Sequence, residues 1–110
     1  MERTLKGWGE KNNIFCNDLC EVSVLSLVPK QRCSWHKHGA KSNLFYVIEG
    51  ELFIVTEWGI AHLTEGQVFT TRPGEYHEFR TGDKPAKIIE IMSVRYDSED
   101  IFRETLGGPI

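Results

Sequence analysis

The feature that most constrains the fold of this chain is the short spacing of its turn signals. Between residues 29 and 85, turns rich in glycine, proline or asparagine recur every eight to twelve residues, with short apolar or β-branched runs between them. Before Asp97, no segment repeats apolar residues at a helical period over three turns. Both observations are typical of an antiparallel sandwich or barrel. We therefore predict one all-β domain.

The expected organisation has three parts. Residues 1–20 are polar and mixed, and we expect a loose N-terminal arm with a docked Trp8 and a short edge strand near residues 13–15. Residues 21–96 carry the barrel. Ser98 can cap a short helix because acidic residues follow it, so residues 97–110 are predicted to form a short helix and tail of the same domain. The strands are expected at residues 21–28, 31–38, 44–48, 51–56, 60–63, 68–71, 76–80 and 87–96.

Composition excludes several classes of function. The 110 residues carry a formal net charge of −3 and no basic run, which argues against nucleic acid as a partner. The longest apolar runs are too short to cross a bilayer, and we expect a cytoplasmic protein that does not bind membranes. Three cysteines, Cys16, Cys20 and Cys33, are an odd number, and a reducing compartment would keep them as thiols.

Three histidines form the main candidate site. His36 and His38 are one residue apart in an extended segment, so their side chains point to the same side of the chain. His77 begins another strand-like run. His62 lies apart from these segments and is interpreted as a structural residue. If the three imidazoles converge, they form one face of a metal site.

The spacing around these histidines resembles the two motifs of the cupin superfamily. The first motif corresponds to Lys30, His36, His38, Asn43 and Gly50, and the second to Gly66, Arg72, Gly74, His77 and Thr81. Every spacing fits, six of the ten positions match in residue type, and fifteen residues separate the motifs. The resemblance implies an antiparallel jelly-roll barrel with a metal near its wider end.

A more particular resemblance extends over nearly the whole chain. Residues 6–9 (Lys-Gly-Trp-Gly), 33–38 (Cys-Ser-Trp-His-Lys-His), 89–91 (Ile-Glu-Ile) and 97–103 (Asp-Ser-Glu-Asp-Ile-Phe-Arg) look like the mannose-6-phosphate isomerase type II cupins. That family's Arg and Glu behind the second histidine are absent. The resemblance implies isomerase or epimerase chemistry on a sugar or sugar phosphate.

Imidazole is a common ligand for zinc, iron, nickel and manganese, so His36, His38 and His77 are predicted to hold a divalent metal. Asn43 stands where the superfamily places a glutamate. It is either a fourth ligand or a turn former. With neutral ligands only, the site keeps a formal charge of about +2, which favours a small anionic ligand.

Isomerisation also needs a base that moves a proton. Glu90 is the first candidate, and the pattern leaves open whether it points into the cavity or to solvent. Tyr46 and Arg72 are further catalytic candidates near the expected mouth. Two alternatives to sugar isomerisation remain: an iron-dependent dioxygenase of a small organic acid or thiol, and a non-catalytic sugar- or metal-binding module. We expect a homodimer, because sheet edges and aromatic surface need protection.

Overall fold

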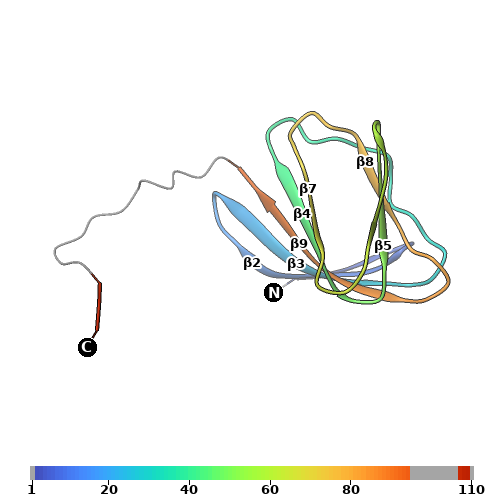
Figure 1. The fold of residues 1–110 in the computed structure, drawn as a ribbon, viewed down its shortest axis with the longest axis horizontal. Coiled ribbons are helices and arrows are strands. Elements are labelled where there is room, and N and C mark those ends of the chain that lie inside the picture. Colours follow the sequence, from blue (N-terminus) through green and yellow to red (C-terminus); the bar gives the residue numbers. More distant parts are fainter. Residues whose placement is uncertain (1, 95–106, 110) are drawn as a thin grey trace.

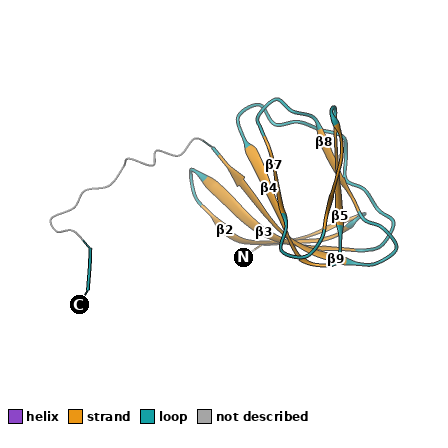
Figure 2. Cartoon of the chain, viewed as in Figure 1, coloured by secondary structure: helices purple, strands orange, loops and turns teal. Residues whose placement is uncertain are grey.

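The structure is a computed structural model that describes residues 2–94 and 107–109. Within these residues it contains no helix, and hence no helix that could cross a membrane. The helix predicted after Asp97 lies outside the described residues. The described part contains nine strands (Figures 1 and 2): β1 (Glu2–Lys6), β2 (Gly9–Cys16), β3 (Cys20–Leu27), β4 (Ser42–Glu49), β5 (Leu52–Thr56), β6 (Gly59–Leu63), β7 (Val68–Thr71), β8 (His77–Arg80) and β9 (Ala86–Ser93).

The strands form two antiparallel sheets that face each other. The larger has the order β1-β2-β3-β9-β4-β7 and the smaller the order β6-β5-β8. Figure 1 shows β4 and β9 opposite β5 and β8. The predicted all-β class and antiparallel sheets are confirmed, but the sheets do not close into a barrel, because no ladder of backbone hydrogen bonds joins them in the described residues. Alternating side chains predict strands with one buried face, and they do not determine whether sheet edges pair.

The core fills the space between the sheets. Alternation places Leu25 and Leu27 of β3 inward, and likewise Phe45 and Val47 of β4, and each of these side chains is at most 2% exposed. The buried apolar residues are Leu25, Leu27, Cys33, Phe45, Val47, Leu52, Ile54, Leu63, Phe79, Ala86 and Ile88. Cys33 belongs to this core, whereas Cys16 is exposed and Cys20 half-buried; all three are free cysteines.

The N-terminal segment is more regular than the predicted loose arm. β2 pairs with β3 over most of its length, and β1 pairs with β2, so both extend the larger sheet. Trp8, between these two strands, packs its ring edge-on against Phe79 with centroids 5.1 Å apart. The docked tryptophan is therefore confirmed. The polar residues around it become strands because the free edge of β3 offers backbone partners.

The connection from β3 to β4 holds two of the three candidate histidines. It runs antiparallel to β8 and is tied to that strand by backbone hydrogen bonds, such as Cys33 N–H to Phe79 O at 3.1 Å. The segment predicted as a strand at residues 31–38 is thus extended, although it forms only isolated bridges. Its pairing with β8 brings the two sequence motifs side by side.

Candidate metal centre

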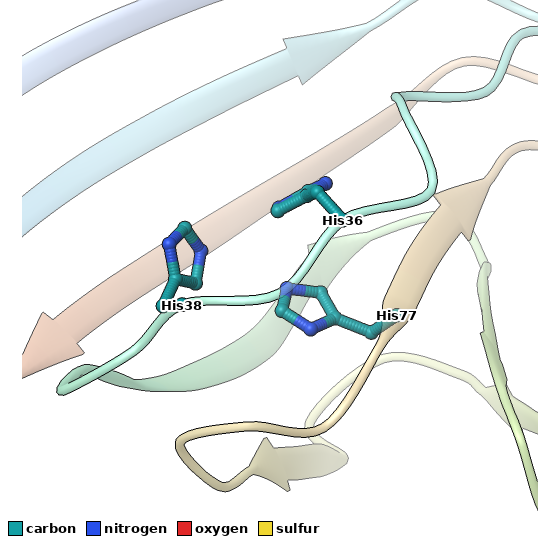
Figure 3. Close-up of side chains that lie close together, drawn as sticks. All are labelled: His36, His38 and His77. Carbon is teal, nitrogen blue, oxygen red and sulfur yellow. The ribbon is translucent and has the colours of Figure 1, made fainter.

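The three histidines of the motifs converge at one point between the sheets. His36 and His77 exchange both backbone hydrogen bonds, at 3.1 and 2.8 Å, and Gly74 N–H donates to His38 O at 2.8 Å. The ring centroids lie 4.5 to 5.5 Å apart. One ring nitrogen from each residue lies within 4.8 Å of the others. Figure 3 shows the rings grouped together, two from the connection before β4 and one from the start of β8.

Backbone carbonyls fix the orientation of two of these rings. His77 Nδ1–H donates to Glu75 O at 3.1 Å, and His36 Nδ1–H donates to Ser34 O at 2.7 Å. A carbonyl can only accept, so the proton of the neutral ring is on Nδ1 and the lone pair on Nε2 is free. Metal-binding histidines commonly have such a partner on the second ring nitrogen.

Burial favours the neutral form that a metal requires. His77 is 1% exposed, and this burial lowers the pKa of its imidazole. The hydrogen bond to Glu75 O opposes the shift, and the neighbouring His36 and His38 lower the pKa further. Burial also lowers the pKa of His38, assisted by His36 and by the positive charges of Lys41 and Lys11. Both rings can therefore offer a lone pair at neutral pH.

The residues present fit a metal ion. Four buried polar side-chain atoms in the described part of the chain have no hydrogen-bond partner: His38 Nε2, His77 Nε2, Asn43 Oδ1 and Thr71 Oγ1. Two of them belong to the histidine cluster, and Asn43 and Thr71 are direct neighbours across β4 and β7. Buried polar atoms without partners are costly in free energy, and a metal with its other ligands would satisfy such atoms.

Asn43 and Glu90 form a hydrogen-bonded pair on the same sheet. Asn43 lies on β4, 1% exposed, and its Nδ2 donates to Glu90 Oε2 at 3.0 Å. That bond uses the amide nitrogen and leaves Oδ1 as a free acceptor. Glu90 points inward and is 9% exposed; burial raises its pKa, while Lys11 and the Asn43 hydrogen bond oppose this rise. Of the two orientations considered for Glu90, the structure has the inward one.

Two other candidates are exposed. Tyr46 follows the buried Phe45 on β4 and therefore points to the outer face, where it is 37% exposed and opposite Val68. Arg72 is exposed in the turn after β7, and its backbone N–H donates to Glu75 Oε1 at 2.7 Å. The structure does not bring the Tyr46 side chain to the histidines.

Thr71 is a residue that the sequence did not suggest. It is 2% exposed, and its hydroxyl lacks a partner beside Asn43. Thr70 precedes it, so a threonine lies on each face of β7. The sequence pattern alone therefore does not show which of the two threonines points inward. Only the register of β7 against β4 identifies it.

The matching family model agrees with the fold and the histidine cluster. Residues 23–92 match the model of the cupin domain. This match covers more than half of the chain and includes all three histidines. The chain therefore belongs to the cupin family. None of the curated proteins matches its sequence.

Solved structures with the same fold have divergent sequences. KdgF from Halomonas sp. superimposes with a TM-score of 0.77 at 13% identity, covering 87% of this chain and 90% of that one. A predicted oxalate decarboxylase from Thermotoga maritima gives 0.74 at 19% identity, with 86% and 91% covered. A protein with a cupin-2 domain from Shewanella frigidimarina gives 0.68 at 21% identity, with 84% and 85% covered. These likenesses establish the fold alone.

Proposed function

We propose that this protein is a metal-dependent cupin that binds a small anionic metabolite of the sugar class and isomerises or epimerises it. The observation that carries the proposal is the combination of three converging histidines with a buried carboxyl group, Glu90, hydrogen-bonded to Asn43. A divalent metal at the histidines would act as a Lewis acid on a carbonyl or enediolate oxygen. We also propose a homodimer in the cytoplasm.

The ligand class follows from charge. The three histidines are neutral ligands, and Asn43 is a neutral residue where a carboxylate would cancel one unit of metal charge. The site with its metal therefore carries about +2 and attracts an anionic group. Glu90 supplies the acid–base function: burial raises its pKa towards the range in which a carboxyl can both accept and donate a proton.

The test compares turnover in matched variants. Protein loaded with zinc, iron, nickel or manganese is given mannose 6-phosphate and a panel of sugar acids, and the products are followed by NMR. We expect His77→Ala to abolish turnover and Glu90→Gln to lower kcat by roughly 10²- to 10⁴-fold. His62→Ala is the control, since His62 pairs with Glu51 on the surface, outside the cluster. Turnover that is unchanged in Glu90→Gln would refute the role of this carboxyl.

One observation favours a second candidate. A face of three histidines without a carboxylate ligand also suits an iron-dependent dioxygenase of a small organic acid or thiol. Oxygen consumption that requires iron and His77 would support this reaction against isomerisation. Binding of sugars without turnover under any of these conditions would instead support a non-catalytic module.

A further inference from the structure

A row of polar side chains leads away from the histidines across the inner face of the larger sheet. Glu90 on β9 lies opposite Ser23 on β3, and Ser23 lies opposite Asn13 on β2. Directly opposed residues point to the same face of a sheet. Side chains two positions away share that face too, so Glu21 and Lys11 belong to the row.

Hydrogen bonds hold the far end of the row together. Asn13 Nδ2 donates to Glu21 Oε1 at 2.9 Å and lies 3.4 Å from Ser23 Oγ. Lys11 Nζ is 3.3 Å from Glu21 Oε1, and both side chains are about one quarter exposed. Ser23 is 1% exposed. The row therefore passes from a buried part beside Glu90 to an accessible part on β2 and β3.

A hollow of about 310 Å³ opens at this accessible end. Lys11, Asn13 and Glu21 line it, together with Glu2, Thr4, Lys6 and Cys16. In Figure 1, the ends of β2 and β3 that meet in their connecting turn lie away from β5 and β8. Lys11, in the lining of the hollow, is also near enough to the histidine cluster for its charge to lower the pKa of both His38 and Glu90. Its side chain therefore lies between the hollow and the site, within reach of a ligand that extends from the histidines.

The charges of the hollow decide what it can bind. Its lining has two lysines and two glutamates, so the cations are compensated and a phosphate dianion would gain no net attraction. Closely spaced donors and acceptors instead match hydroxyl groups, each of which both donates and accepts. We propose that Lys11, Asn13 and Glu21 bind the hydroxyl-bearing end of a sugar acid whose acidic end lies at the histidines. This inference rests on the function proposed above and narrows its ligand class.

The experiment measures binding to the Zn²⁺-loaded protein by calorimetry. The probes are gluconate, hexanoate, which has the same carbon chain and no hydroxyls, and mannose 6-phosphate. We expect gluconate to bind at least tenfold more tightly than hexanoate, since each hydrogen bond to a charged or polar group contributes roughly this factor. Asn13→Leu should weaken gluconate binding about tenfold and leave hexanoate unchanged.

Asn12→Leu is the matched control. Asn12 directly precedes Asn13 on β2, is exposed, and points to the opposite face. Three outcomes would overturn the subsite while leaving the proposed function intact. They are equal affinity for gluconate and hexanoate, equal effects of the two asparagine variants, and tighter binding of mannose 6-phosphate than of gluconate. Failure of all three probes to bind would overturn the proposed function itself.

Discussion

Binding of a metal by the histidine cluster should raise the thermal stability of the protein by a predictable amount. A ligand that binds only the folded state at 100 times its Kd stabilises that state by about 2.7 kcal/mol. For a chain of 110 residues, the unfolding entropy is about 0.23 kcal/mol per kelvin. We therefore expect the melting temperature to rise by about 12 °C when zinc, iron, nickel or manganese is added at that ratio.

The variant that tests this reasoning is His77→Ala. His77 is the most buried of the three histidines and is the one supplied by β8. If its loss weakens the metal 100-fold, the same concentration stabilises by only about 0.4 kcal/mol, or about 2 °C. Differential scanning fluorimetry compares the melting temperature of each protein with that of its own metal-free form. The destabilisation caused by the cavity in His77→Ala is then present in both measurements and cancels. His62→Ala should keep the full shift.

Two results would refute the metal assignment. The first is a wild-type protein whose melting temperature responds to none of the four metals. The second is a shift of equal size in His77→Ala, which would place the metal elsewhere on the chain.

Two further predictions concern the metal-free protein. The pKa values of His38 and His77 are lowered below 6.5 in the folded state, so the unfolded chain binds more protons below that pH. The contribution of these two histidines to stability is present above pH 6.5 and is lost as the pH falls towards their folded-state pKa values. Urea unfolding from pH 5 to 8 should show this loss of unfolding free energy. A His38→Gln/His77→Gln variant should lose less. Gly50→Ala should destabilise by more than about 2 kcal/mol, because residue 50 has φ +82° and a Cβ there would lie 2.6 Å from Pro85 O. Gly66→Ala, at φ +83° in open space, should cost only about 1–2 kcal/mol, and equal losses in urea unfolding would contradict the role of the close contact.

Much of the fold could be predicted from local pattern. The strands with strong alternation were found within one or two residues, β4 and β5 among them, because a buried face imposes a period of two on the sequence. β1 was not predicted, and only a short edge strand near residues 13–15 was expected within β2, since the polar residues of these strands show no such period. These strands exist because of their hydrogen bonds to β3, which a local pattern does not contain.

The candidate site divides in the same way. Its histidines could be predicted because the distances between them along the chain are those of two motifs that pair in space. Glu90 could not be placed, because Ile89 and Ile91 on either side are both apolar and give no preference for a face. Only the register of β2 and β7 against their neighbouring strands shows that three further residues lie on the inner face: Lys11, Asn13 and Thr71.

The sequence by itself determined the all-β class, the positions of most strands and the three candidate ligands, because turns, alternation and motif spacing are local properties. Only the tertiary structure decided that the two sheets do not close into a barrel, that Glu90 points inward and bonds to Asn43, and that a polar row crosses to β2. Each of these depends on which strands pair and in which register, and pairing is a contact between residues distant in the chain.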